Sequence, residues 1–168
     1  MIRAVVKTAC QEYACDIVGI EDGYDGLVMP GKTRPLTPDA VRGLLSRGGT
    51  VLGTANRGNP IARKALRGGQ EVIEDISHEV QAGFQRLGLD GLIVVGGDGT
   101  LRIAHELGQR FGLPIVGVPK TIDNDFRRVF GQFRHICGNC DGWYQGGAAR
   151  GGAAADRVLR VLRQAVGR

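Results

Sequence analysis

The stretch GLIVVGGDGTLRIAHELGQRFGLPIVGVPKTIDND, residues 91–125, determines the fold that we expect for this chain. It opens with a continuous apolar run at 91–95, which is typical of a strand buried in a parallel sheet. Apolar residues at helical intervals follow in 101–111, and a second apolar run covers 113–118. Strand, helix and strand in this order make a βαβ unit. We therefore predict an α/β fold with a mostly parallel sheet and flanking helices.

Further segments in the first half of the chain carry signals for regular structure. Apolar residues at fourfold spacing predict a helix over 2–13, and the β-branched run at 15–20 predicts a strand. Thr37 precedes a proline, as an N-cap residue often does, and the helix that follows would end at the glycine pair 48–49. Residues 71–87 space their apolar side chains along one face, as an amphipathic helix does.

The apolar content of the chain is that of a soluble globular domain. Apolar residues make up 42% of the sequence, and no window approaches the run of about 18 apolar residues that a membrane-spanning helix needs. No small-residue cleavage site of a secretory signal follows the N-terminus. The cysteines are too few and too irregularly spaced for a disulfide framework. We expect a cytoplasmic protein with reduced thiols and no membrane segment.

Charge is distributed unevenly between the body of the chain and its last segment. Residues 127–168 hold eight arginines and two aspartates, a net charge of +6, whereas residues 1–126 are close to neutral at −1. The last segment is rich in Gly and Ala and shows little periodicity. An arginine-rich arm for nucleic acid, with Phe133, Trp143 and Tyr144 as stacking residues, is the alternative, but the RGG triplet occurs once within it. We expect an irregular tail and no nucleic-acid partner.

The glycine-rich loop GGDGT lies where the first strand of the βαβ unit meets its helix. Gly96 and Gly97 have no side chains, so the backbone can approach a polyphosphate closely. A helix beginning near Thr100 directs free N–H groups at the anion. Asp98 supplies the hard oxygen that Mg²⁺ prefers, and with Gly99 these residues are predicted to form a nucleotide–magnesium site. The alternative is a tight strand-to-helix turn with a capping aspartate.

A second polar loop, PKTIDND, follows the next strand and lies at the equivalent edge of the predicted sheet. Lys120 can neutralise phosphate charge, and Thr121 offers a hydroxyl. Asp123 and Asp125 are two residues apart, so in an extended loop only one of them easily points into a crevice. A carboxylate there can accept the proton of an attacking sugar hydroxyl in phosphoryl transfer. A surface Asx-turn is the alternative interpretation.

The two loops together resemble the phosphofructokinase family. In this chain GGDGT at 96–100 is followed about twenty residues later by GVPKTIDND at 117–125, a pairing typical of that family. The segments IEDGYDGL, residues 20–27, and RGGTVLGTANRGNP, residues 47–60, are also similar to it. The resemblance covers about three quarters of the chain, and the pair of loops is specific.

The resemblance implies transfer of a phosphoryl group from Mg-ATP to the 1-hydroxyl of fructose 6-phosphate, a step of glycolysis. By this resemblance Asp98 holds Mg²⁺, and Asp123 is the base that takes the proton of the sugar. Supporting roles fall on neighbouring residues, namely Lys120, Thr121, Ile122 and Asp125 at the substrate and Asn56 and Arg57 near the nucleotide. The resemblance also implies a homo-oligomer for the complete enzyme.

Two residues bear on the phosphoryl donor in opposite directions. Gly99, directly after the motif aspartate, resembles the ATP-using members, in which a larger residue would crowd the nucleotide. Lys120, directly before TIDND, is common among members that use pyrophosphate. We expect ATP, because room for the nucleotide is the stricter requirement. The alternatives are a pyrophosphate-dependent phosphofructokinase, an NAD or lipid kinase that shares GGDGT, and a nucleotide-binding remnant without turnover.

Two departures from the family concern the ends of the sequence. The strand and glycine-rich loop with which the family begins, of the form GGDxPGxN, do not precede the helix at Met1. Codons permitted for residues 132–144, read one base later, allow FDTSVETATDGI, which resembles the next helix of the family. We therefore interpret 1–126 as a partial phosphofructokinase nucleotide-binding lobe and 127–168 as an out-of-frame, poorly ordered tail. We expect this fragment to be inactive.

Overall fold

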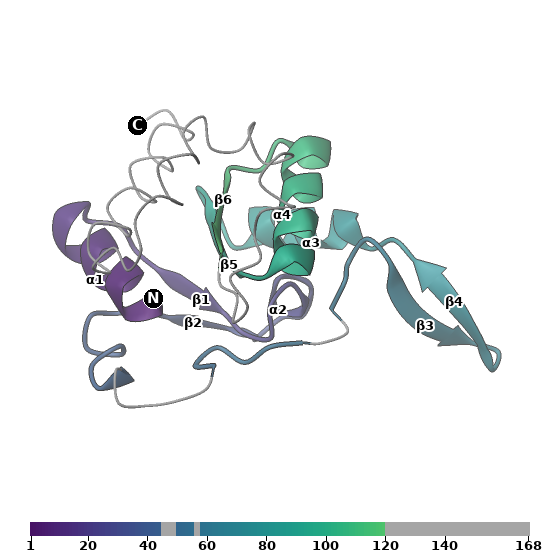
Figure 1. The fold of residues 1–168 in the computed structure, drawn as a ribbon, viewed down its shortest axis with the longest axis horizontal. Helices are drawn as coiled ribbons and strands as arrows, with labels where there is room; N and C mark the ends of the chain where they lie inside the picture. The colour runs from purple at the N-terminus through teal and green to yellow at the C-terminus, as the bar shows by residue number, and fades with distance from the viewer. Residues whose placement is uncertain (45–49, 56–57, 120–168) are drawn as a thin grey trace.

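The computed structural model describes residues 1–44, 50–55 and 58–119, whose path is shown in Figure 1. These ranges contain both helices and strands, including a parallel strand pair joined by a helix, so the predicted α/β class is confirmed. In chain order the elements are α1 (Ile2–Glu12), β1 (Val18–Ile20), α2 (Asp25–Val28), β2 (Thr33–Pro35), β3 (Arg63–Arg67), β4 (Gln70–Glu74), α3 (Ser77–Arg86), β5 (Leu92–Gly96), α4 (Asp98–Phe111) and β6 (Ile115–Pro119).

The predicted βαβ unit is confirmed and contributes most of the main core. β5 and β6 pair in parallel, and their last residues, Gly96 and Pro119, lie opposite each other. α4 connects the two strands and packs against both of them (Figure 1). Leu101 is one of its buried contact residues. A Cβ added to Gly117 in β6 would lie 3.0 Å from Leu101 Cδ2, so the glycine allows the helix to approach the strand closely. This unit brings the ends of the two strands, from which the predicted loops start, to one edge of the strand pair.

The main hydrophobic core lies between the βαβ unit and helices α2 and α3. Its buried members are Tyr24, Leu27, Val80, Phe84, Leu92, Val94, Leu101, Ala104, Leu107 and Ile115. α3 crosses α2 at Gly83, where an added Cβ would overlap the carbonyl oxygen of Leu27. Arg86 Nη2 donates a hydrogen bond to the same oxygen at 2.9 Å. The short helix α2, and the turn that leads into it, are thereby held against α3.

The remaining strand pairs of the described residues are antiparallel. β1 pairs with β2. α1 contributes Val6 to a smaller core that also contains Leu36, directly after β2, and Val41. β3 pairs with β4. Both pairs join neighbouring segments of the chain, whereas the parallel pair β5–β6 needs the crossover helix α4. No helix within the described ranges has the length and apolar character required to cross a membrane.

The helix predicted after Thr37 is wrong over residues 38–43, which form turns. The cap that suggested it is present, because the N–H of Ala40 donates to Thr37 Oγ1 at 3.2 Å. Gly43 then adopts a left-handed φ of +79°, a conformation that ends helices, and the helical path is broken after one turn. The glycine pair 48–49, where the predicted helix would end, lies outside the described residues.

The helix predicted over 71–87 is correct only in its second half. α3 begins at Ser77, and the residues before it form β4 of a hairpin instead. Gly68 and Gly69 connect β3 to β4 with φ values of +59° and +82°, as a two-residue hairpin turn with positive φ at both central residues requires. Because this turn reverses the chain, the segment that follows pairs as a strand. The hairpin extends away from the rest of the protein (Figure 1).

Candidate functional site

The GGDGT loop forms the junction between β5 and α4. β5 ends at Gly96, Gly97 is the N-cap residue, and α4 begins at Asp98, two residues before the start that we predicted. The N–H of Leu101 donates to the Gly97 carbonyl at 3.0 Å as the first bond of the helix. The N–H groups of residues 98–100 precede this bond, so they point out of the helix end together with the positive end of its dipole. This arrangement is suited to an anion.

Three glycines of the loop have different structural roles. A Cβ on Gly96 would lie 2.7 Å from Thr100 Cβ, so a glycine at this position lets the helix start fold back over the strand end. At Gly99 an added Cβ would meet no atom of the described residues within 4 Å, so packing within this part of the chain does not require a glycine there. Gly97 is extended, with φ of −86° and ψ of −171°, a conformation open to other residues. As far as the described residues go, the space beside Gly99 at the helix end is open.

Asp98 is the charged residue of this helix end, and the described residues offer no hydrogen-bond partner to one of its oxygens. Within the described part of the chain, Asp98 Oδ1 is buried and accepts no hydrogen bond. A buried charge without compensation is costly, and a hard divalent cation is the usual partner of a carboxylate beside phosphate. The residue therefore fits the predicted role of a Mg²⁺ ligand, in a position where the helix amides would hold the phosphate.

Tyr24 connects the turn before α2 to the start of α4. Its hydroxyl donates a hydrogen bond to the carbonyl oxygen of Thr100 at 2.8 Å. The side chain is only 8% exposed, and this burial raises the pKa of the phenol, so the hydroxyl stays protonated and remains a donor. The sequence did not identify Tyr24 as a site residue, although it lies in the segment IEDGYDGL that resembles the family.

The segment that leads to Asn56 and Arg57 lies against the same turn. The N–H of Asp22 donates to the Leu52 carbonyl at 2.8 Å. A Cβ on Gly58 would lie 3.2 Å from Asp25 Oδ2, so this carboxylate approaches the chain just beyond the two predicted nucleotide residues. Asn56 and Arg57 themselves lie outside the described residues. The residues on both sides of Asn56 and Arg57 thus contact the segment Asp22–Asp25. Tyr24 of the same segment is hydrogen-bonded to Thr100 of the phosphate loop.

The second predicted loop begins where the described part of the chain ends. β6 finishes at Pro119, which is paired with Gly96, so PKTIDND leaves the strand pair directly beside GGDGT. The catalytic and substrate residues predicted in this loop, Lys120, Thr121, Ile122, Asp123 and Asp125, lie outside the described residues. The register thus brings the starts of the two loops together, and the roles of the second loop stay predictions.

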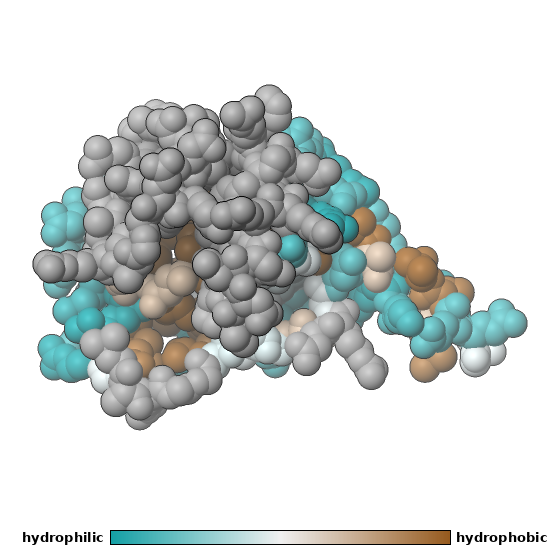
Figure 2. All heavy atoms as spheres, in the orientation of Figure 1, coloured by the Kyte–Doolittle hydropathy of each residue, from teal (hydrophilic) through white to brown (hydrophobic). Residues whose placement is uncertain are grey.

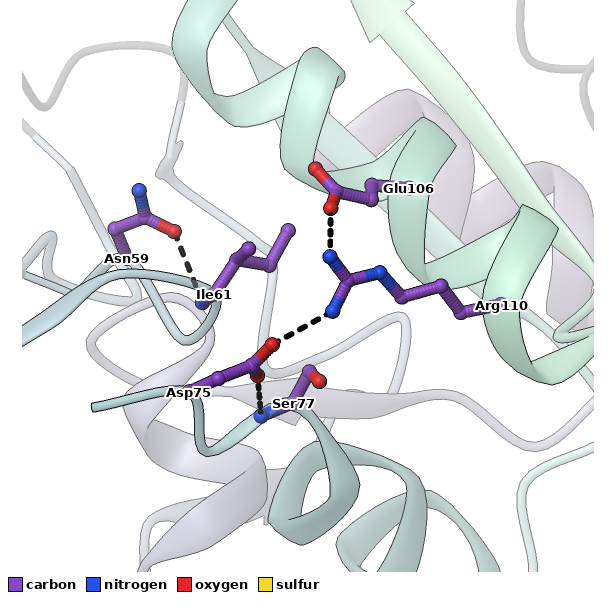
Figure 3. Close-up of polar contacts among 6 residues, drawn as sticks. All are labelled: Asn59, Ile61, Asp75, Ser77, Glu106 and Arg110. Atoms are coloured by element: carbon purple, nitrogen blue, oxygen red, sulfur yellow. Dashed lines mark hydrogen bonds and ion pairs between the residues drawn. The ribbon is translucent and has the colours of Figure 1, made fainter. Parts of the chain in front are cut away.

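A polar network at the opposite end of α4 joins this helix to the start of α3 (Figure 3). Asp75 Oδ1 accepts a hydrogen bond from the Ser77 N–H at 2.9 Å, and Oδ2 accepts one from Arg110 Nη1 at 2.6 Å. Arg110 also pairs with Glu106 one turn earlier in α4. Hydrogen bonds from Ser77 and then from Arg110 lower the pKa of Asp75 to about 2. The network joins the last turns of α4 to the residues that precede α3.

The fold and the loop define the class of protein: an α/β protein with a glycine-rich anion-binding geometry between a parallel strand and its crossover helix. A family model described as Phosphofructokinase matches residues 1–129. The chain belongs to the phosphofructokinase family.

Individual relatives agree with the family model. The ATP-dependent 6-phosphofructokinase 1 of Synechocystis is 43% identical over 126 residues, which are 74% of this chain and 34% of that protein. The pyrophosphate–fructose 6-phosphate 1-phosphotransferase of Streptomyces coelicolor is 46% identical over 125 residues, or 74% of this chain and 33% of that protein. The crystal structure of Pichia pastoris phosphofructokinase in the T-state matches with a TM-score of 0.59 and 29% identity, over 74% of this chain and 14% of that one. The chain spans about a third of the length of the curated relatives it matches.

Proposed function

We propose that this chain carries the phosphate-binding part of a 6-phosphofructokinase, which transfers a phosphoryl group from Mg-ATP to the 1-hydroxyl of fructose 6-phosphate. The observation that supports this most directly is the register of β5 and β6. Gly96 lies opposite Pro119, so the loop with the metal-binding carboxylate and the loop with the proposed base leave one edge of the sheet side by side. Phosphoryl transfer needs these two functions on either side of the transferred group.

Each residue of the first loop has a defined task in this proposal. The amides of residues 98–100 and the helix dipole bind phosphate oxygens. Asp98 would hold Mg²⁺ through Oδ1, which has no hydrogen-bond partner among the described residues. Bound Mg²⁺ would neutralise charge that develops on the phosphate oxygens. Tyr24 keeps the first turn of α4 in place through Thr100.

The second loop supplies the chemistry at the sugar. Asp123 accepts the proton of the 1-hydroxyl as that oxygen attacks the phosphorus, and Lys120 balances phosphate charge. Thr121, Ile122 and Asp125 position the sugar phosphate, and Asn56 and Arg57 approach the nucleotide. We propose the cytoplasm as the compartment of the complete enzyme and a homo-oligomer as its assembly, as the resemblance implies.

ATP is the proposed donor, and pyrophosphate is the second candidate. The open space at Gly99 leaves room beside the helix end for the rest of a nucleotide. Relatives named for either donor match this chain at similar identity, so the choice depends on this residue. Gly99→Asp should reduce the binding of Mg-ATP more than tenfold and leave the binding of Mg-pyrophosphate nearly unchanged, as measured by calorimetry. An equal loss for both donors would contradict the assignment.

The function is tested first on the 168-residue chain itself. We expect it to bind Mg-ATP by calorimetry without producing fructose 1,6-bisphosphate, because it spans about a third of the length of its relatives. Asp98→Asn should abolish the magnesium dependence of this binding, whereas Asp39→Asn on the exposed surface should not change it. If Asp98→Asn binds Mg-ATP with the same magnesium dependence as the unchanged chain, the proposed site is refuted. Turnover with NAD or diacylglycerol, but not with fructose 6-phosphate, would favour the alternative kinases.

A further inference from the structure

The hairpin β3–β4 has one face that is exposed throughout. In an antiparallel pair, opposite residues share a face, and the register puts Lys64 opposite Ile73 and Leu66 opposite Glu71. We call these four residues the tip face. Leu66 is 76% exposed and Ile73 is 74% exposed. The hairpin projects from the protein in Figure 1, and apolar brown surface lies among the hydrophilic teal on it in Figure 2.

The other face of the hairpin differs from the tip face in its surroundings. Arg63, Ala65, Val72 and Glu74 are partly buried, whereas all four residues of the tip face are exposed. Single exposed aliphatic residues are ordinary on protein surfaces, but here two large ones share one face of a projecting element. The tip face therefore has the composition of a contact surface.

The four residues of the tip face form a two-by-two arrangement with a specific pattern. Lys64 and Glu71 occupy one diagonal and are joined by an ion pair of 3.3 Å between Nζ and Oε2. Leu66 and Ile73 occupy the other diagonal. Each diagonal is thus of one kind, charged or aliphatic, and the charged diagonal has opposite signs at its ends. A surface that covers the tip face must therefore place aliphatic side chains on Leu66 and Ile73, and opposite charges on Lys64 and Glu71.

A second copy of the same face matches this pattern when a two-fold axis runs along the aliphatic diagonal. Leu66 then meets Leu66 of the partner subunit, and Ile73 meets Ile73 of the partner subunit. Each Lys64 lies opposite Glu71 of the partner subunit. An axis along the charged diagonal would instead bring the two Lys64 side chains together, and an axis along the strands would put Leu66 on a carboxylate. A two-fold contact requires such self-complementarity.

We propose that the tip face is a self-association surface, through which two copies of this chain pack their hairpins face to face with crossed strands. The occupant is a second copy because the charges of the face complement themselves in this one orientation. The proposal is independent of the phosphoryl-transfer function. Four side chains cover much less than the ~800 Å² per partner of a standard interface, so this contact alone is weak and depends on concentration. Its charged part weakens with added salt.

Two charge variants and their mixture test the proposal by sedimentation velocity over a concentration series of the full chain. Lys64→Glu puts a glutamate opposite Glu71 of the partner subunit, and Glu71→Lys puts a lysine opposite Lys64 of the partner subunit. Each variant alone should therefore associate at least tenfold more weakly than the unchanged chain. An equal mixture should regain association, because one copy then carries two glutamates and the other two lysines on this face.

The mixture separates a contact between copies from effects within one hairpin. Mixing cannot repair the repulsion that each variant has inside its own hairpin, so recovery requires two copies to meet at this face. Nonspecific electrostatic attraction cannot explain the recovery either, because the chain has a net charge of +5 and both variants keep a positive net charge. The proposal is overturned if either variant associates like the unchanged chain, or if the mixture associates no more than its components.

Matched variants on the opposite face of the hairpin complete the experiment. Arg63→Glu makes the same charge change as Lys64→Glu but should leave association unchanged. Gln70→Lys adds a lysine near the turn on that face and should not rescue Lys64→Glu in a mixture. Rescue by Gln70→Lys would overturn the two-fold arrangement. Circular dichroism and thermal unfolding of every variant verify that the fold is retained. Leu66→Ser with Ile73→Thr should reduce association without any change of charge.

Discussion

The hydroxyl of Tyr24 donates a hydrogen bond to the carbonyl oxygen of Thr100, which lies 76 positions later in the sequence. The bond joins the turn before α2 to the first turn of α4, so two segments that resemble the family separately are parts of one structure. Because Tyr24 also belongs to the main core, any movement of this turn would disturb both the core and the phosphate loop.

Tyr24→Phe removes this hydrogen bond while keeping the ring. We expect the free energy of unfolding to fall by about 1 kcal/mol, the usual net value of one hydrogen bond. Amide hydrogen exchange should quicken in the first turn of α4 and stay unchanged in α1, which packs in the other core. Tyr24→Leu should cost more, because it also removes ring volume from the core. Equal free energies of unfolding for Tyr24→Phe and Tyr24→Leu would contradict this explanation.

Gly83→Ala should destabilise the protein strongly. The added methyl group would overlap the carbonyl oxygen of Leu27, and backbone on one side must move to accommodate it. We expect a loss of about 3 kcal/mol or more in urea unfolding, at the upper end for a single substitution. Gly99→Ala is the matched control within α4, where the methyl group meets no atom of the described part of the chain within 4 Å. This control should be neutral or slightly stabilising, since alanine is the better helix former.

Asp75 should make stability depend on pH in the acid range. Its pKa is about 2 in the folded protein, against about 3.9 in an unfolded chain, because Ser77 and Arg110 stabilise the carboxylate. A lowered pKa contributes stability that is complete above about pH 5 and is lost as pH falls toward 2. The carboxylate is 43% exposed, so screening reduces the contribution to about 1 kcal/mol or less.

Asp75→Asn measures this contribution, because it keeps an acceptor for the Ser77 N–H but removes the charge. The unchanged chain should be more stable than this variant in urea at pH 7, and the difference should shrink between pH 5 and pH 2. Asp39→Asn, in an exposed ion pair with Arg42, serves as the control and should show no such trend. A difference that stays constant over this pH range would assign the effect to hydrogen bonding instead of charge.

The last segment gives a prediction at the level of DNA. We propose that residues from about 127 onward are translated out of frame, because the codons permitted for 132–144 also allow FDTSVETATDGI. The nucleotide sequence read one base later should continue to resemble the family beyond this point. A reading in that frame that soon meets a stop codon, or that shows no resemblance, would contradict the proposal.

Most of the βαβ unit could be predicted from sequence because its signals are local and agree with one another. The apolar run at 91–95 starts with Gly91 and is followed by Gly96, and Gly112 ends α4 in the left-handed conformation expected after a helix. The helix start was predicted two residues late, at Thr100, because the predicted helix was placed from apolar spacing alone. The N-cap geometry of Gly97 decides the boundary and is not visible in that spacing.

The two helix predictions that differ from the structure have a common cause. In each segment the local sequence fits more than one conformation, and a glycine turn determines which one forms. EVIE at 71–74 fits a strand as well as a helix, and the pair Gly68–Gly69 selects the strand. Two glycines between apolar segments are the usual sequence signal of such a hairpin turn. Gly43 similarly overrides the cap at Thr37. The contact of Tyr24 depends on tertiary packing, and no spacing rule indicates it.

The pairing of Gly96 with Pro119 makes the distance between the two loops sensitive to chain length in the short connection 112–114. Adding or deleting one residue there would slip β6 by about 3.3 Å against β5 and turn alternate side chains to the other face. Substitutions in this connection should therefore be tolerated far better than insertions or deletions. Homologous proteins with the same chemistry should vary there in residue type while keeping the number of residues.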